Sequence, residues 1–252
     1  MYVIFFIDLF ALTSAAGLWN PTARIFGGGE VTPKFKYNWL TSLSYRGKHK
    51  CGGTLLNSCT VLTAAHCVYG RDEEWRARFH RHNLTLTSAE ENGRESRIFN
   101  RTVHPNFDTT GNNENDVAIW KVRAGVASFV FLDTGKFAVP DTLLRVVGWG
   151  ITEARSGTSP ILKEVKVPVY DPAKCRIAFP ELDASSQFCA GYPEGGRDAC
   201  QADSGGPIFH ISKLRYTLVG IVSYGEGCGE KGFPGVYTNI STVKHFILSN
   251  LR

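Results

Sequence analysis

Short apolar segments, each ended by turn-forming residues, run through most of the chain and constrain its fold more than any other feature. They cover residues 39–44, 53–56, 117–122, 143–147, 161–169 and 218–223, and clusters of Gly, Pro, Asn and Asp separate them. Short strands with regular turn signals indicate a β-barrel or a β-sandwich. The 252 residues allow one large domain or two smaller ones, and a hydrophobic content of 43% excludes disordered and collagen-like chains.

Two stretches are predicted to be helical. Asp171 is a candidate N-cap, and Pro172 suits the first position of a helix that continues to residue 178. Near the C-terminus Ser241 is the candidate cap of a helix with one apolar face, which consists of Val243, Phe246, Ile247 and Leu251. We expect this helix to pack on the barrel. Residues 124–142 have few charges and weak alternation, so we interpret them as a connector between two β halves that divide near residue 135.

The N-terminus and the net charge concern compartment and partners. Residues 3–12 form an apolar run that Asp8 interrupts, and small residues follow at 13–17. This pattern predicts a signal peptide over residues 1–17, with a buried N-terminal strand as the alternative. No later stretch is long and apolar enough to span a bilayer, so we expect a secreted, extracellular protein without a membrane partner. The net charge of +5 comes without a clustered basic stripe, which argues against nucleic-acid binding.

The cysteines are consistent with an oxidising compartment. There are seven of them, so six would pair and one would be left over. The absence of a C-x-x-C pair argues against zinc. Three triplets, which begin at Asn83, Asn100 and Asn239, match the N-glycosylation pattern and predict a glycoprotein.

Three segments carry residues suited to nucleophilic catalysis. They contain His66 beside Cys67, Asp116 before an apolar run, and Ser204 between an Asp and two Gly. Each alone has an ordinary structural interpretation: a metal ligand, a strand start and a tight turn. Together they meet one chemical requirement, because a serine hydroxyl needs a base within hydrogen-bond reach and the base needs an orienting partner.

These segments resemble the trypsin-like serine proteases of the chymotrypsin fold, in which His, Asp and Ser occur in this order. The resemblance covers residues 25–252 and includes further motifs at 51–53, 148–150, 188–192, 223–225 and 234–237. It implies an all-β fold of two six-stranded antiparallel β-barrels with a C-terminal α-helix. The first barrel would cover about 25–135, the second about 136–240 and the helix about 241–252. It also implies that Ser204 is the nucleophile, His66 the general base and Asp116 its orienting partner, in a cleft between the barrels.

The same resemblance implies an oxyanion hole formed by the backbone N–H groups of Ser204 and Ala202. The family normally has Gly at position 202, and Ala keeps the N–H donor but adds a methyl group where a glycine-like backbone is expected. We expect the methyl group to be accommodated and to narrow the choice of substrate. The alternative is a donor that points away from the substrate and lowers turnover.

The same resemblance implies a specificity pocket around Asp198, which lies six positions before Ser204, where the trypsin-type members have an acidic residue at the base of the pocket. A buried carboxylate calls for a cation, so cleavage is expected after Arg, then Lys; the alternative is a solvated Asp in a surface loop. Ala199 replaces a frequent Ser, which favours Arg because a Lys ammonium gains more from a hydroxyl acceptor. The remaining predicted substrate-binding residues are Gln201, Ser223, Tyr224, Gly225 and Gly235.

Arg24 and Ile25 resemble the activation site of the family. Residues 18–24 would form a short activation propeptide, and cleavage after Arg24 would free the Ile25 amine to pair with Asp203. Phe26 replaces the smaller aliphatic residue that is usual there.

The resemblance also implies disulfides and a calcium loop. The expected pairs are Cys51–Cys67, Cys175–Cys189 and Cys200–Cys228, which leave Cys59 as a buried thiol or an intermolecular link. The calcium loop corresponds to residues 80–95, where Arg81 stands in place of the first acidic ligand. Glu90, Glu91 and Glu95 remain, but calcium needs several oxygen ligands, so we expect no metal and no other cofactor.

The predicted function is that of a secreted serine endopeptidase made as a zymogen, acting as a monomer on proteins or peptides and open to protein protease inhibitors. The alternative from another class is a catalytically weak or silent homologue that binds a protein partner. The triad, Asp198 and the activation site favour the enzyme. A hydrolase of non-peptide esters would use the same triad, but Asp198 argues against it because it demands a cation.

Overall fold

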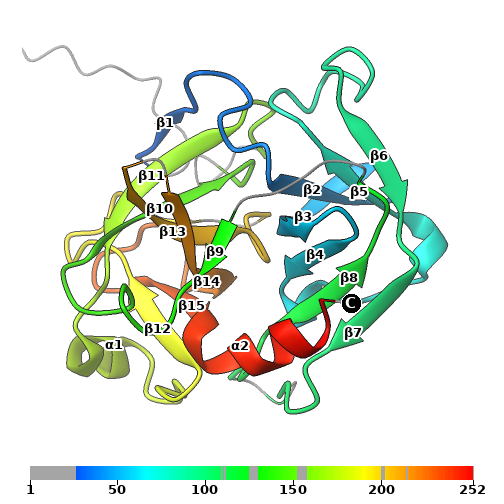
Figure 1. Cartoon of the computed structure of the whole chain (residues 1–252). Coiled ribbons are helices and arrows are strands. Elements are labelled where there is room, and N and C mark those ends of the chain that lie inside the picture. Colours follow the sequence, from blue (N-terminus) through cyan, green and yellow to red (C-terminus); the bar gives the residue numbers. More distant parts are fainter. Residues whose placement is uncertain are drawn as a thin grey trace, which may run out of the picture.

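Two curled β-sheets make up most of the computed structural model, which describes residues 27–108, 110, 112–124, 130–151, 158–199, 202–213 and 215–251 (Figure 1). Within these residues most of the regular secondary structure is strand, which confirms the all-β class and the two-barrel architecture expected from the sequence. The predicted signal peptide (1–17), the activation propeptide (18–24) and Ile25 lie outside the described residues, as do Cys200 and Gln201.

The first sheet contains seven strands, all antiparallel to their neighbours, in the order β6-β5-β2-β3-β4-β8-β7. They are β2 (Leu40–Tyr45), β3 (Lys48–Asn57), β4 (Thr60–Thr63), β5 (Trp75–Phe79), β6 (Arg94–Arg97), β7 (Asn100–Val103) and β8 (Ala118–Lys121). The two edge strands, β6 and β7, are separated in sequence only by Ile98 and Phe99. This short link brings the two edges together and curls the sheet into a barrel (Figure 1).

The second sheet contains eight strands in the described residues, with β1-β11-β10-β13-β14-β15-β12 as its main path. They are β1 (Gly29–Glu30), β9 (Val130–Leu132), β10 (Leu143–Gly148), β11 (Lys163–Pro168), β12 (Gln187–Ala190), β13 (Pro207–Ser212), β14 (Arg215–Tyr224) and β15 (Gly235–Asn239). β9 pairs parallel with β14, whereas the other strand pairs are antiparallel. The strand counts exceed the expected six because short edge strands add to the second sheet and because β6 and β7 count separately.

β1 and β9 show that the chain does not divide between the sheets at one residue. β9 lies inside the predicted connector, residues 124–142, yet its Val130–Leu132 backbone pairs with Tyr216–Leu218 of β14. β1, near the start of the described chain, pairs with β11. Both strands come before residue 135 in sequence and join the second sheet, where they give its edge backbone groups hydrogen-bond partners.

The helices follow the sequence prediction with one correction. α1 (Pro172–Ala178) is capped by Asp171, whose carboxylate accepts from the N–H groups of Ala173 and Lys174 at 2.8 and 3.1 Å. α2 (Ile240–Ser249) is capped by Asn239 rather than by Ser241, because the helix begins directly at the end of β15. The Asn239 side chain accepts from the Ser241 N–H at 3.0 Å. Neither helix is long and apolar enough, within the described chain, to cross a membrane.

The largest buried cluster joins the two sheets to α2. It contains four tryptophans that are at most 1% exposed, and the inner face of α2 packs into it through Ile240, Val243, Phe246 and Ile247. In Figure 1 this helix lies along one side of both sheets. The predicted packing of the C-terminal helix on the barrels is confirmed.

Two predicted disulfides are present, Cys51–Cys67 and Cys175–Cys189. Cys228 is also disulfide-bonded, and its predicted partner, Cys200, lies outside the described residues. The expectation that Cys59 is buried is wrong, because Cys59 is exposed in the tight turn between β3 and β4. An intermolecular link through Cys59 stays a prediction.

Candidate active site

His66 and Asp116 are brought together by the register of two strands in the first sheet. Thr63 at the end of β4 lies opposite Ala118 at the start of β8. His66 follows Thr63 in a short 3₁₀ helix, Ala65–Cys67, and Asp116 precedes Ala118 by two residues. Both residues therefore emerge from the same end of the paired strands.

The Asp116 carboxylate holds the His66 ring in one orientation. Oδ2 lies 2.7 Å from His66 Nδ1, and Oδ1 accepts from the His66 backbone N–H at 2.9 Å. Ser223 Oγ donates to Oδ2 at 2.5 Å, so the carboxylate is fully buried but well satisfied. Because a carboxylate accepts, Nδ1 carries the imidazole proton and Nε2 keeps its lone pair, which is the tautomer of a general base.

Ser204 lies in a tight turn that is anchored to both sheets. Its carbonyl accepts from the Gly52 N–H of β3 at 2.8 Å, and the next residue, Gly205, donates to Val222 O of β14 at 2.8 Å. Gly205 has a φ of +76°, and a Cβ there would lie 2.1 Å from Thr63 Oγ1, so only glycine fits. Among the described residues, no hydrogen bond joins Ser204 Oγ to the imidazole, a looseness common in nucleophile–base pairs without substrate.

Ala202 adopts the glycine-like backbone that the sequence raised as a question. Its φ is +72°, in the left-handed region, where a Cβ costs about 1–2 kcal/mol. Its carbonyl lies 3.0 Å from Nε2 of His49, and Ser42 Oγ lies 2.8 Å from Nδ1 of the same ring. Burial lowers the pKa of His49 to about 4, so the ring is neutral at pH 7 and donates to Ala202 O while it accepts from Ser42.

A cavity of about 270 Å³ beside Ser204 contains most of the predicted substrate-binding residues. Its lining includes Asp198, Ala199, Ser223, Tyr224, Gly225 and Gly235, as predicted, together with Tyr237, which the sequence analysis did not assign. A Cβ on Gly235 would lie 2.7 Å from Asp198 Oδ1 and 3.0 Å from the Tyr237 hydroxyl. Gly225 faces Gly235 across the slot, at 3.8 Å from an added Cβ to the opposite Cα. The two glycines therefore keep the cavity open down to the carboxylate.

Asp198 at the floor of this cavity is buried and only partly satisfied. Its Oδ2 accepts from the Gly229 N–H at 3.3 Å, whereas Oδ1 has no hydrogen-bond partner in the described part of the chain. The Tyr237 hydroxyl beside it is likewise without a partner there. Burial raises the pKa of Asp198 to about 7. An unpaired buried carboxylate next to open space is the environment that a bound cation would stabilise.

Asp203 is buried next to the predicted nucleophile, and its carboxylate packs directly against two glycines. Its Oδ1 accepts from the Gly150 N–H at 2.8 Å. A Cβ on Gly148 or Gly150 would lie 2.1 or 2.2 Å from one of its carboxylate oxygens. The predicted partner, the Ile25 amine, lies outside the described residues.

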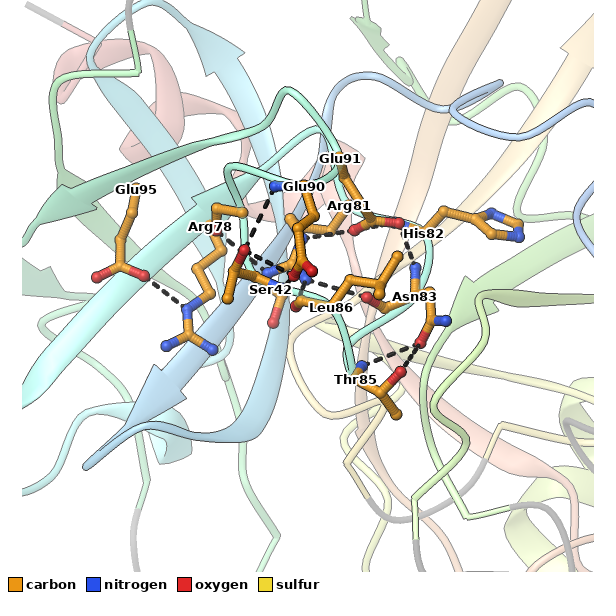
Figure 2. Close-up of polar contacts among 12 residues, drawn as sticks. Ser42, Arg78, Arg81, His82, Asn83, Thr85, Leu86, Glu90, Glu91 and Glu95 are labelled. Atoms are coloured by element: carbon orange, nitrogen blue, oxygen red, sulfur yellow. Dashed lines mark hydrogen bonds and ion pairs between the residues drawn. The ribbon is translucent and has the colours of Figure 1, made fainter.

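The loop that corresponds to the calcium site of the family contains a guanidinium group in place of a metal ligand (Figure 2). The Arg81 side chain is 1% exposed, and Nε donates to Glu91 Oε2 at 2.7 Å. Its Nη2 donates to the carbonyls of Asn83 and Leu86 at 3.0 and 2.5 Å, and Nη1 to Ser88 Oγ at 3.2 Å.

The other two carboxylates of this loop are also engaged. Glu90 accepts from Thr87, and Glu95 accepts from Arg78 at 2.8 Å. Because a cation already occupies the acceptors that would face a metal, the residues of this loop do not fit a calcium ion. The sequence showed that Arg81 stands in place of an acidic residue, but it did not show which buried groups the guanidinium contacts.

Comparisons with known proteins agree with this geometry. The trypsin family model matches residues 25–247. The vitellin-degrading protease of Bombyx mori is 36% identical over 246 residues, which cover 91% of this chain and 87% of that protein. Trypsin eta of Drosophila erecta is 34% identical over 261 residues, with 96% of both chains covered. Trypsin-1 of Salmo salar is 32% identical over 249 residues, with 96% of this chain and 97% of that protein covered. The chain therefore belongs to the trypsin family of serine proteases and is a serine endopeptidase.

Proposed function

We propose that this protein cleaves peptide bonds after Arg, and less readily after Lys, through Ser204, His66 and Asp116. The observation that carries the specificity is Asp198, whose buried Oδ1 has no hydrogen-bond partner in the described residues and faces the cavity that Ser204 borders. An Arg side chain in that cavity would supply two N–H groups to the carboxylate, and its charge would offset the cost of burying Asp198.

The proposed reaction is acyl transfer in two steps. Ser204 Oγ attacks the substrate carbonyl carbon while His66 Nε2 takes the hydroxyl proton, and the N–H groups of Ala202 and Ser204 donate to the carbonyl oxygen as it becomes negative. His66 then gives the proton to the leaving amine, which breaks the peptide bond and leaves an ester on Ser204. Water hydrolyses the ester with His66 as the base again. Asp116, fixed by Ser223, keeps the ring in the required tautomer throughout.

The Ala202 methyl group is proposed to restrict the leaving-group side of the cleft rather than to remove an oxyanion donor. The observation that supports this is the left-handed φ of +72°, because the backbone keeps the conformation that a glycine would adopt. The hydrogen bond from His49 to the Ala202 carbonyl supports that conformation, because it holds the peptide group that follows Ala202.

We propose further that the enzyme is secreted as a zymogen and becomes active when the bond between Arg24 and Ile25 is cut. Gly27, two residues after the new terminus, lies against the loop between β12 and β13, where a Cβ would be 2.2 Å from the Gly196 carbonyl oxygen. A terminus held there supports a pairing between the Ile25 amine and Asp203. Of the three candidate glycosylation sites, Asn100 is exposed, whereas Asn83 and Asn239 are half-buried, so we propose Asn100 as the acceptor.

The experiment that tests this function is the hydrolysis of matched peptide amides after controlled cleavage at Arg24. The panel carries Arg, Lys, Leu, Phe or Ala before the scissile bond. We expect the Arg amide to be hydrolysed fastest and the three uncharged amides to be nearly inert. The control is Ser204→Ala, which should abolish hydrolysis of every amide. Equal turnover of the Arg and Leu amides, or an active Ser204→Ala protein, would contradict the proposal.

A further inference from the structure

A second depression, separate from the specificity cavity, lies between the first sheet and residues 158–160, which lead into β11. It has a volume of about 490 Å³, and its lining includes Lys48, His49 and Lys50 of β3, Arg78 of β5, and Leu84 and Thr85 of the following loop. We call it the basic groove. It shares no lining residue with the cavity that contains Asp198.

The basic groove is connected to the reacting end of the active site through β3. His49 lies within it and contacts Ala202 O at 3.0 Å, while Gly52 of the same strand donates to Ser204 O at 2.8 Å. Along a strand the backbone advances by about 3.3 Å per residue, and β3 has a bulge at Lys50, so Lys50 and Lys48 lie at most roughly 7 and 13 Å beyond the Ser204 contact. An extended substrate covers the same distance with two to four residues.

This position determines which part of a substrate would reach the groove. On the proposed function, the Asp198 cavity takes the side chain before the scissile bond. His49, which lines the groove, contacts the carbonyl of Ala202 two residues before Ser204, and none of the groove's lining residues belongs to that cavity. It therefore faces the second to fourth residues after the scissile bond.

The charges in the groove are of one sign. Lys48 and Lys50 are exposed, and neither has an ion pair or hydrogen bond with another described residue. Arg78 is bonded to Glu95 at 2.8 Å, and no acidic side chain lines the groove in the described part of the chain. Two uncompensated lysines beside Arg78 attract an anionic side chain and repel a cationic one.

One wall of the groove is held in place before any substrate arrives. Arg81 Nη2 donates to the carbonyls of Asn83 and Leu86, which flank Leu84 and Thr85 in sequence (Figure 2). The buried pair with Glu91 fixes the guanidinium itself. A preformed wall lowers the entropy cost of binding a peptide against it.

We propose that the basic groove selects protein substrates with Asp or Glu at the second to fourth position after the scissile bond, and that Lys48 and Lys50 determine this preference. The inference rests on the proposed function and adds a second specificity to it. Exposed ion pairs of this kind change a rate by about two- to fivefold per acidic residue. The preference should weaken in salt, because the screening length falls from about 10 Å at 0.1 M to about 3 Å at 1 M.

The test uses quenched fluorescent peptides with Arg before the scissile bond that differ only at the third position after it, as Asp, Asn or Lys. For the activated enzyme we expect kcat/KM to fall in the order Asp, Asn, Lys at 0.1 M salt and to be nearly equal at 1 M salt. In the double variant Lys48→Glu/Lys50→Glu the order should reverse. The matched control Lys136→Glu/Lys166→Glu makes the same change in net charge at lysines that are also exposed but do not line the groove, and it should keep the original order.

A small Arg amide without residues after the scissile bond separates the two proposals. If the enzyme hydrolyses this amide but cleaves the Asp and Lys peptides equally, the groove proposal is overturned and the proposed function stands. The same conclusion follows if the Asp preference persists in Lys48→Glu/Lys50→Glu, or if the control variant reverses it. An activated protein that hydrolyses neither the amide nor the peptides contradicts the proposed function, and the groove proposal with it.

Discussion

The substitution Arg81→Met should destabilise the protein strongly, although it lies outside the active site. Arg81 and Glu91 have side chains that are 1% and 4% exposed, and the guanidinium donates to Glu91, Ser88 and two backbone carbonyls. Methionine fills a similar volume but leaves the buried carboxylate and carbonyls without this partner. Removing one member of a buried pair costs about 3–5 kcal/mol. That is a large share of the roughly 5–15 kcal/mol that stabilises a typical domain.

The assay is urea unfolding followed by tryptophan fluorescence, in a Ser204→Ala background to prevent self-digestion. Arg78→Met is the matched control, because its partner Glu95 is 39% exposed and such a pair contributes at most about 1 kcal/mol. The second variant Arg81→Met/Glu91→Leu should recover part of the loss, since an apolar pair replaces a broken ion pair. Neither excess calcium nor a chelator should change the urea concentration at which half of the parent protein is unfolded, because Arg81 already occupies the acceptors of the loop.

The pH dependence of this effect has a definite sign. Burial raises the pKa of Glu91, but hydrogen bonds from Arg81 and from the backbone amides of Asn83 and His82 outweigh it and hold the pKa below its ordinary value of 4.5. The pair therefore stabilises the fold above about pH 4.5 and loses that contribution as the pH falls through the lowered pKa. The gap between the parent and Arg81→Met should close in acid. The reasoning is refuted if Arg81→Met unfolds within about 1 kcal/mol of the parent at pH 7, or if calcium stabilises the parent.

Three further predictions concern the active site. Ala202→Gly should change the turnover of a small Arg amide by less than about tenfold. The same variant should have higher activity on protein substrates and higher affinity for protein inhibitors. A gain in amide turnover of about 10² or more would instead indicate a restored oxyanion donor. The affinity for benzamidine, a small amidinium cation, should fall by up to tenfold per pH unit below about pH 7. Burial raises the pKa of Asp198 to about 7, and only the ionised carboxylate binds a cation. An equal affinity at pH 5 and pH 7 in equilibrium titrations would contradict this. Ala199→Ser should lower the ratio of kcat/KM for an Arg amide to that for the matched Lys amide. The added hydroxyl gives a Lys ammonium a hydrogen-bond acceptor worth about 1.5–3 kcal/mol. An unchanged ratio would count against that explanation.

Much of the fold and of the candidate site could be predicted from local sequence patterns. The six apolar segments between turn residues coincided with β2, β3, β8, β10, β11 and β14, and the Asp171-Pro172 pair marked the start of α1. The motifs around His66, Asp116 and Ser204 indicated the family, and the resemblance to that family pointed to Asp198 six positions before Ser204. These features succeed because strand period, helix capping and motif spacing depend on residues that are close together in the chain.

The remaining features depend on contacts that no local pattern contains. His49 meets the Ala202 carbonyl across 153 positions of sequence, and β9 pairs with a strand that the connector pattern did not indicate. Ser241 and Asn239 are both residue types that cap helices well, and only the position where β15 ends decided that Asn239 is the N-cap of α2. The sequence contained Arg81 in place of an acidic residue, but only the folded loop made its guanidinium the partner of Glu91. Burial and long-range packing decided these points, because the free energy of a buried charge or a strained residue depends on the neighbours that tertiary structure supplies.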